Sequence, residues 1–424
     1  MSKKNTVSIE RRDDFGRNSS KINEEKQMHK TPKLRFNKFT EFWKFTNLED
    51  AYIKGRIGWK NLTRDEYTKE GPYFISGKDI NDGKIMWDTC EHITIERYEE
   101  SPEIKLQNND IILTQRGTLG NSAFIENLTK KATINANMIL LRANKEIYPL
   151  YLYYIIKSDY FKKFIHKITS VGCISSLFQK DLKKFEFPYP SYEEQKEISY
   201  FLSEIDIKID LMERKHKLLI KFKLYLLNKI FKSSFSDEWM IRKLSDIAVI
   251  GKGFTPSTRN PDFWDGEYSW LSIADMPENN ESKYITNSKK TITQEGTKNR
   301  NIIKKGTLIM SFKLSVGKLG ILKKDMYTNE AICNFTWKKE DISTEYMYYY
   351  LSSINIMKYG AQAVKGVTLN NDSLNSIPIK LPPVKVQEKI ALFLSYIDRK
   401  IELSNKQIDL MKNYKSGLLQ KMFI

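Results

Sequence analysis

The chain has 424 residues, of which 70 are basic and 52 acidic, and its formal net charge at pH 7 is +18. Hydrophobic residues make up 40% of it and aromatic residues 12%, so it can build folded cores and a wholly disordered chain is excluded. This length predicts two or three domains. No apolar run approaches the roughly 18 residues needed to cross a bilayer, and the charged N-terminal residues lack the apolar stretch of a secretory signal.

The three cysteines, Cys90, Cys173 and Cys333, lie far apart in the sequence. Their odd number and their spacing exclude a disulfide framework and a cysteine-based zinc site, and they fit a reducing compartment. We therefore expect a cytoplasmic protein without a membrane partner. The positive charge favours a polyanionic partner, first of all nucleic acid. The alternative is that a composition rich in Lys, Asn and Ile is common to all proteins of the source genome. Charge alone does not decide between a nucleic-acid partner and this compositional bias.

The sequence contains an internal repeat, one copy near the middle of the chain and one at its end. Residues 195–231 match residues 387–423 at a constant offset of 192 without a gap. The identical residues of the first copy are Gln195, Ile198, Phe201, Leu202, Ser203, Ile205, Asp206, Lys208, Ile209, Leu211, Leu226, Leu227, Lys229 and Phe231. Weaker matches precede each copy at offsets of 195 to 197, such as Tyr151 with Tyr346. The drifting offset indicates two related modules whose loops differ in length.

The repeat and the composition together predict five segments. Residues 1–33 are polar and lack periodic apolar residues, so we expect a flexible tail. Two globular modules follow at 34–190 (module 1) and 236–382 (module 2). Each is followed by a helical segment, at 191–235 and 383–424.

Heptad spacing in both helical segments predicts a coiled coil. The expected seam residues are Ile198, Leu202, Ile205, Ile209, Met212, Leu219, Leu226, Ile390, Leu394, Ile397, Ile401, Ile408, Met411 and Leu418. A single amphipathic helix packed on its own domain would show a similar stripe. Helices of ~38 residues, however, are ~57 Å long at 1.5 Å per residue, longer than a small domain is wide, so we expect the two to pair with each other. His216 falls in the seam, where it is a better candidate for setting register than for binding a metal.

Local signals place the ends of these helices and the elements of the modules. Ser191 and Glu194 have capping-box spacing, with Glu194 expected to reach back to Ser191. Buried strands are expected at 110–114 and 307–311, and helices at 151–165 and 346–356. Because strands and helices do not alternate regularly, the predicted class is α+β rather than a doubly wound sheet.

The sequence lacks the common signatures of catalysis. Gly317-Lys318 is not part of a phosphate-binding loop, the Asn/Asp-Pro-Pro-aromatic motif of amino-methyltransferases is absent, and the four histidines show no metal-binding spacing. Glu278, Glu281 and Lys283 imitate a metal-nuclease pattern, but the acids are too close together, and a solvated loop explains them. We expect neither catalysis nor a metal in this chain.

Loops rich in hydroxyl groups and cations are better suited to binding DNA. Hydroxyls, amides and guanidinium groups hold phosphates and read base edges. The candidates on this basis are Arg116 and Thr118 in module 1, with Lys252, Thr255, Ser257, Thr258, Arg259, Lys313, Ser315 and Lys318 in module 2. An ordinary basic turn is an equally good explanation for any one of them.

At this point the chain resembles the DNA-specificity (S) subunit of type I restriction-modification systems over residues 34–424. The resemblance rests on four motifs: Leu381-Pro-Pro-Val-Lys-Val-Gln387-Glu-Lys-Ile390, Pro190-Ser-Tyr-Glu-Glu-Gln195-Lys-Glu-Ile198, Gly253-Phe-Thr-Pro-Ser257 and Pro32-Lys-Leu-Arg-Phe36. Module 1 lacks the Gly-x-Thr-Pro-Ser loop and carries Lys54-Gly-Arg56-Ile-Gly-Trp59-Lys60 instead, which resembles another subclass of recognition domain. The resemblance adds Lys54, Arg56, Lys60 and Lys78 to the DNA-binding candidates.

The resemblance implies a non-catalytic subunit without a cofactor of its own. Each module would read half of a split, asymmetric target in double-stranded DNA, and the helices would form an intramolecular antiparallel coiled coil that spaces the modules, giving a pseudo-two-fold repeat. Two methyltransferase (M) subunits that use S-adenosylmethionine, and restriction (R) motor-nuclease subunits that use ATP and Mg, would be the partners. Two alternatives stay open: a nuclease or methyltransferase-associated enzyme in its own right, and a DNA-binding scaffold unrelated to restriction.

Overall fold

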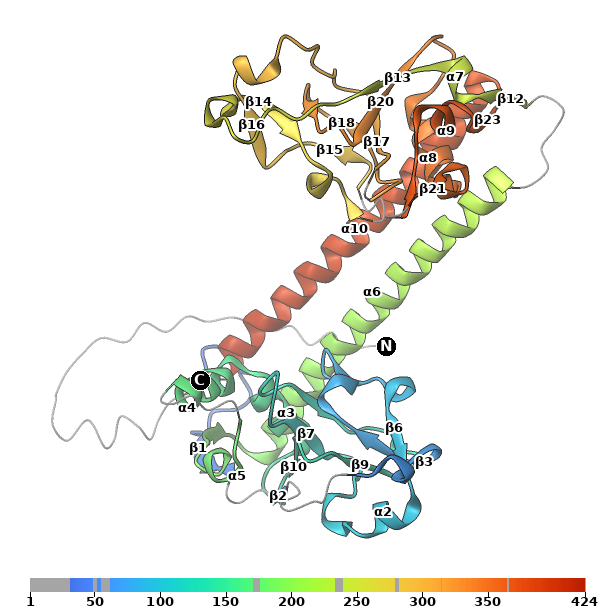
Figure 1. Cartoon of the computed structure of the whole chain (residues 1–424). Coiled ribbons are helices and arrows are strands. Elements are labelled where there is room, and N and C mark those ends of the chain that lie inside the picture. Colours follow the sequence, from blue (N-terminus) through green and yellow to red (C-terminus); the bar gives the residue numbers. More distant parts are fainter. Residues whose placement is uncertain are drawn as a thin grey trace, which may run out of the picture. The chain divides into compact units, whose positions relative to one another are not determined.

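The computed structural model describes residues 31–48, 52–54, 62–170, 176–232, 239–278, 282–313, 315–363 and 366–423 (Figure 1). The chain divides into two compact units, Met1–Met212 with Gln407–Ile424 (unit 1) and Glu213–Lys406 (unit 2). Each unit therefore holds one mixed module and one half of each of two long helices. No helix in the described ranges is both long and apolar enough to cross a membrane.

The described part of unit 1 contains small sheets and three clusters of buried hydrophobic residues. The largest sheet has the order β2, β10, β7, β8 (Tyr52–Lys54, Met138–Arg142, Ile111–Thr114 and Ser122–Phe124). Three smaller ones are β6-β3-β9 (Glu91–Ile93, Tyr67–Ile75 and Ala132–Ile134), β1-β11 (Lys44–Asn47 and Glu186–Tyr189) and the hairpin β4-β5 (Ile80–Asn81 and Lys84–Ile85). The helices of the module are α2 to α5 (Ile95–Glu99, Pro149–Lys157, Asp159–Ser170 and Gln179–Leu182).

Unit 2 repeats three of these sheets in the same strand order and adds a fifth strand, β15, to the main one. Its main sheet is β13, β20, β17, β18, β15 (Ala248–Lys252, Ile332–Trp337, Leu308–Ser311, Leu319–Leu322 and Tyr284–Ile285). The smaller sheets are β16-β14-β19 (Lys290–Ile292, Trp264–Leu271 and Tyr327–Thr328), β12-β23 (Met240–Lys243 and Pro378–Leu381) and β21-β22 (Ala361–Ala363 and Gly366–Thr368). Its helices are α7, α8 and α9 (Leu244–Ile247, Thr344–Ser353 and Asn371–Asn375).

The long helices α6 (Tyr192–Lys232) and α10 (Val384–Met422) pair in each unit. In unit 1 the Lys415 Nζ lies 2.5 Å from Asp206 Oδ1, and in unit 2 the Lys223 Nζ lies 2.6 Å from Asp398 Oδ1. The two residue numbers have the same sum in both pairs, which requires the helices to run antiparallel in one common register. The two ion pairs also join equivalent positions of the repeat, since Asp206 corresponds to Asp398 and Lys223 to Lys415 at the offset of 192.

The module of each unit packs on this helix pair through equivalent residues. The ring of Phe423, the residue after α10, packs on Tyr151 with 5.5 Å between centroids, and the Phe231 ring of α6 packs on Tyr346 at 5.7 Å. In unit 1 the α6 residues Ile198 and Leu202 join Tyr151 in one apolar core, while Leu394 of α10 joins Tyr346 in unit 2. Burial of these rings and aliphatic side chains gives the main driving force that joins each module to its helices.

Buried glutamines reinforce the same junction. The Gln195 side-chain oxygen accepts a hydrogen bond from the Tyr148 amide at 2.8 Å, and its nitrogen donates to the carbonyls of Glu146 and Pro190, both at 3.0 Å. In unit 2 the Gln387 oxygen accepts from the Ser343 amide at 3.0 Å. Its nitrogen donates to the carbonyls of Asp341 and Pro382 at 3.1 and 2.9 Å. Each glutamine therefore pairs three backbone groups that would otherwise lie unpaired where the module meets the helix.

The structure confirms the predicted α+β class, the antiparallel helix pairing and the buried strands β7 and β17. Every predicted seam residue is buried or half-buried. The helix expected at 151–165 is two helices, α3 and α4, with Ser158 between them. Residues 1–30, most of the predicted tail, lie outside the described residues.

The capping box predicted at the start of α6 is only half correct. Ser191 caps the helix, since its Oγ accepts a hydrogen bond from the Glu194 amide at 3.4 Å. The Glu194 carboxylate does not return to Ser191 but accepts two hydrogen bonds from the Arg35 guanidinium, both at 2.7 Å, and one from Trp43 Nε1 at 3.3 Å. A bidentate ion pair with arginine is stronger than a neutral cap, and it ties the start of module 1 to α6.

Candidate nucleic-acid interface

The loop that follows β13 carries most of the candidates in module 2. Gly253 and Phe254 bind back to the sheet through their amides, which donate to the carbonyls of Ile332 at 3.0 Å and Thr328 at 2.7 Å. Ser257, Thr258 and Arg259 beyond this anchor are exposed. In the described part of the chain Arg259 has no carboxylate partner, so its guanidinium is available to a phosphate or a base edge.

Two predicted cations of module 2 come together on one aromatic ring. Lys252 at the end of β13 and Lys313 after β17 have their ammonium groups 5.1 and 5.6 Å from the centroid of the buried Phe312 ring. Both residues are exposed, although they are 61 positions apart in the sequence. The ring therefore contacts two exposed cations, and cations of this kind suit phosphate binding.

Other candidates are engaged within the protein. Lys318 Nζ lies 2.5 Å from Glu278 Oε1, and the Thr255 hydroxyl donates to Glu330 and accepts from Asn329 at 3.1 Å. In module 1 Lys78 pairs with Glu91 at 2.9 Å, and this hydrogen bond raises the Lys78 pKa above its ordinary value. Contact with DNA at these positions would require the internal pair to open, so they are weaker candidates than Lys252, Lys313 and Arg259.

The loops after β7 and β17 close in the same way. Thr114 Oγ1 donates to the Thr118 carbonyl as Ser311 Oγ donates to the Ser315 carbonyl, and both Thr118 and Ser315 are exposed. Arg116, also exposed, makes a β-bridge with Ser176. Equivalent loops of the two modules therefore present a guanidinium in module 1 and an ammonium, Lys313, in module 2.

The remaining candidates of module 1 cannot be placed in this surface. Lys54 is the last residue of β2, but its side chain is not described. Arg56 and Lys60 lie outside the described residues.

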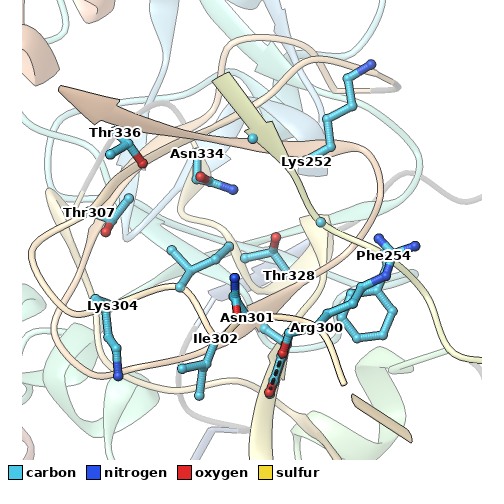
Figure 2. Close-up of a pocket in the computed structure, with 14 residues that line it drawn as sticks. Lys252, Phe254, Arg300, Asn301, Ile302, Lys304, Thr307, Thr328, Asn334 and Thr336 are labelled. Atoms are coloured by element: carbon cyan, nitrogen blue, oxygen red, sulfur yellow. Dashed lines mark hydrogen bonds between the residues drawn. The ribbon is translucent and has the colours of Figure 1, made fainter. Parts of the chain in front are cut away.

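A pocket beside the module 2 loop contains residues that the sequence reasoning missed (Figure 2). Three parts of the chain that are distant in sequence line it: the loop at 251–254, the segment at 300–307 and residues of β19 and β20 at 327–336. The Arg300 guanidinium lies 4.8 Å from the centroid of the Phe254 ring. Arg300 and Asn301 have the same types of side chain as the candidate loops, and this composition was the one sequence signal that could have marked them.

The described residues offer no alternative site for metal or thiol chemistry. No group of three or more His, Cys, Asp or Glu side chains in these ranges could hold a metal ion. Cys90 and Cys333 are buried, and burial raises the pKa of both thiols to about 12. Thiols of such high pKa are poor nucleophiles at neutral pH.

Comparison with known proteins gives the family of the chain. Residues 41–221 and 236–413 match the type I restriction modification DNA specificity domain. The putative type I restriction enzyme MjaX specificity subunit of Methanocaldococcus jannaschii is 25% identical over 91% of this chain and 94% of its own length. The MjaIX specificity subunit of the same organism is 30% identical over 44% of each chain, so that alignment spans less than half of the relative.

Solved structures show the same fold. The crystal structure of the type I restriction-modification S subunit from M. genitalium has a TM-score of 0.55, with 16% identity over 93% of this chain and 99% of that chain. A chain from a type I R-M system studied for its complex assembly and conformational transition has a TM-score of 0.56, with 14% identity over 89% and 96%. The chain therefore belongs to the family of type I restriction-modification DNA specificity subunits, the non-catalytic component that recognises the DNA target.

Proposed function

We propose that this protein reads a split, asymmetric target in double-stranded DNA and holds two methyltransferase subunits on its helices. The observation that carries the proposal is the repetition of the whole module–helix junction. Gln195 and Gln387 make the same three hydrogen bonds, and the two Lys–Asp pairs are the same positions with the helices exchanged. A subunit built in this way has two equivalent places for DNA half-sites and two for a repeated partner.

The asymmetry of the target follows from the side chains that the modules present. The described loops differ, with Arg116 in module 1 and Lys313 in module 2 at equivalent places. The Gly-x-Thr-Pro-Ser loop and the pocket beside it belong to module 2. Different donors select different base edges, so the two half-sites should differ in sequence rather than repeat each other in inverted order.

The partner surface in this proposal is the outer face of the helices. Apolar side chains lie exposed on the helix faces that do not form the seam, namely Tyr200, Ile207, Leu211, Leu410 and Tyr414 in unit 1, and Leu218, Phe222, Tyr225, Leu392, Tyr396 and Leu403 in unit 2. These residues form the outer apolar face of each unit. Exposed apolar residues in such number on one surface are typical of a protein–protein interface.

The outer apolar faces of the two units share repeat positions. Leu218 and Leu410 are 64% and 69% exposed, and Leu211 and Leu403 are 59% and 49% exposed. Because each pair has the offset of 192, one kind of partner can bind both units through the same contacts. We assign this partner as the methyltransferase subunit, which would bring S-adenosylmethionine. Restriction subunits that use ATP and Mg would join the complex in the cytoplasm.

Native mass spectrometry of the chain co-expressed with the methyltransferase of its own operon tests the scaffold. The wild type should carry two methyltransferase subunits. Leu218→Glu should remove one of them, because a buried charge on one copy of the surface leaves the other copy intact. Lys221→Glu, an exposed change on the same helix, is the matched control. A Leu218→Glu complex that keeps two methyltransferase subunits contradicts the proposed surface.

The DNA surface has its own test. Alanine at Arg259, Lys313 or Arg116 should weaken binding, and loss of a phosphate contact should lower the dependence of log affinity on log salt by roughly one. Loss of a base contact should cost about 1–3 kcal/mol and relax one position of the target. If the triple alanine variant binds DNA with the affinity and salt dependence of the wild type, these residues do not form the interface.

A further inference from the structure

The pocket in module 2 has a volume of about 470 Å³ and is open to solvent on one side. Three chain segments line it with hydroxyl and amide side chains, three cations, two aromatic rings and two isoleucines. The charged and amide or threonine residues are Lys252, Arg300, Asn301, Lys304, Thr307, Thr328, Asn334 and Thr336 (Figure 2). No aspartate or glutamate lines it. A negatively charged group can therefore enter without meeting a carboxylate.

Two glycines allow the loop backbone to lie directly against the polar groups of the pocket. A Cβ at Gly253 would lie 2.2 Å from the Thr328 carbonyl oxygen and 2.3 Å from the Thr328 hydroxyl. A Cβ at Gly251 would lie 2.6 Å from the Asn334 side-chain oxygen. The backbone of the loop thus passes directly against the polar groups of the pocket. Any side chain at either position would displace them, so the Gly-Lys-Gly part of the loop serves the pocket as well as the turn.

One polar group of the pocket has no partner within the protein. The Thr328 side chain is 1% exposed, and its hydroxyl makes no hydrogen bond with any residue in the described ranges. In the view of Figure 2 Thr328 lies between Asn334 and Arg300. Buried hydroxyls are nearly always hydrogen-bonded, so this one can still take a partner, but the Gly253 backbone covers it and must shift before a ligand can reach it.

Three cations line the pocket, Lys252, Arg300 and Lys304, and Arg300 is the one held against its aromatic side. The Arg300 guanidinium lies against the Phe254 ring, and the Tyr327 hydroxyl donates to the Arg300 carbonyl at 3.1 Å. No carboxylate pairs with Arg300 within the described residues. Lys304, by contrast, pairs with Asp325 at 2.9 Å, and the Lys252 side chain is directed away from the other labelled residues in Figure 2.

We propose that this pocket binds one nucleotide. The Arg300 guanidinium would hold its phosphate, since arginine matches phosphate geometry. The Asn301 and Asn334 amides and the Thr328 hydroxyl would hydrogen-bond the edge of its base. The interior is large and carries several amides, which a phosphate ion alone would not use, whereas a base with its phosphate uses both the amides and the Arg300 guanidinium.

The bound nucleotide can have one of two origins: it is either one nucleotide of the bound DNA strand or a free nucleotide. The first rests on the proposed function and requires that the unit leaves the base stack, because a base within a duplex cannot enter a pocket. The second does not depend on the proposed function.

Calorimetry with the four 2′-deoxynucleoside 5′-monophosphates tests the second source on the full chain. Binding of at least one of them should be about tenfold weaker in Arg300→Gln, which removes a charged hydrogen bond, and unchanged in Lys339→Ala, an exposed cation of the same module outside the pocket. Thr328→Val should weaken the same binding while raising the melting temperature of the ligand-free protein, because it removes an unpaired buried hydroxyl without changing its shape.

Fluorescence of 2-aminopurine tests the first source. The probe is placed in turn at each half-site position of the target duplex, and the chain is added without a methyltransferase. A rise in fluorescence at one position, lost in Arg300→Gln and Thr328→Val, assigns the pocket to a DNA nucleotide. Loss of monophosphate binding in the same variants assigns it to a free nucleotide. If neither signal is found, the inference is overturned. Failure of the wild type to bind any duplex would instead refute the proposed function, and calorimetry would still decide on the pocket.

Discussion

The Gln195→Met substitution tests how much the buried glutamine stabilises the junction between module 1 and the helices. Gln195 is fully buried and makes three hydrogen bonds to backbone groups. Methionine keeps the length of the side chain and removes all three. At a net value of about 1 kcal/mol for each bond, the variant should lose about 3 kcal/mol of stability. Because one tenfold change corresponds to about 1.4 kcal/mol, this is a change of roughly a hundredfold in the local opening equilibrium.

Native-state hydrogen exchange read by mass spectrometry is the assay, because it reports on each unit separately. Peptides of α3 and β11 should lose protection by roughly a hundredfold in Gln195→Met, while peptides of module 2 keep theirs. Gln387→Met should give the reverse pattern. Gln407→Met, an exposed glutamine of α10, is the control and should change neither. Equal loss of protection in both units, or a loss below about threefold in module 1, would refute the reasoning.

Two further predictions follow from charge and burial. Lys415→Met should destabilise unit 1 by about 1 kcal/mol, and the value is small because the Asp206 carboxylate is 35% exposed. A double-mutant cycle with Asp206→Asn, measured by urea unfolding, should give a coupling energy of the same size. Additive effects of the two substitutions would contradict the ion pair. In a Cys173→Ser variant, Cys90 and Cys333 should resist a thiol reagent at pH 8, because a pKa of about 12 leaves about one thiol in 10⁴ as thiolate. Both cysteines should react in denaturant. Rapid labelling of the native protein would refute their burial.

The repeat in the sequence was sufficient to predict that the two helices pair, and the family resemblance supplied their antiparallel sense. The heptads locate the seam, and the constant offset relates Asp206 with Lys415 to Asp398 with Lys223. The strands β7 and β17 were predictable for a similar reason, since each is a short apolar run with turn residues at its ends. Local patterns of this kind are sufficient to predict local structure without knowledge of the tertiary contacts.

Contacts between distant parts of the chain could not be predicted in this way. Glu194 and Ser191 have capping-box spacing, but Arg35, 159 positions before Glu194, takes the carboxylate. The nucleotide pocket depends on Arg300, Thr328 and Asn334, which the sheet topology brings together. No spacing rule connects such residues, because loops of variable length separate them. Lys318 similarly matched the composition of a DNA loop, and only the fold reveals its pairing with Glu278.

The central claim is that two different modules on one chain read two different half-sites, and mapping of the methylated motif tests it most directly. The chain is expressed with the methyltransferase of its operon in a host without methylation, and methylated adenines are located across the genome. The account predicts a motif of two unlike parts around an unread spacer, with half-site centres about 10 base pairs apart, one helical turn, so that both modules meet the same side of the duplex. A continuous motif or a palindromic one would contradict it.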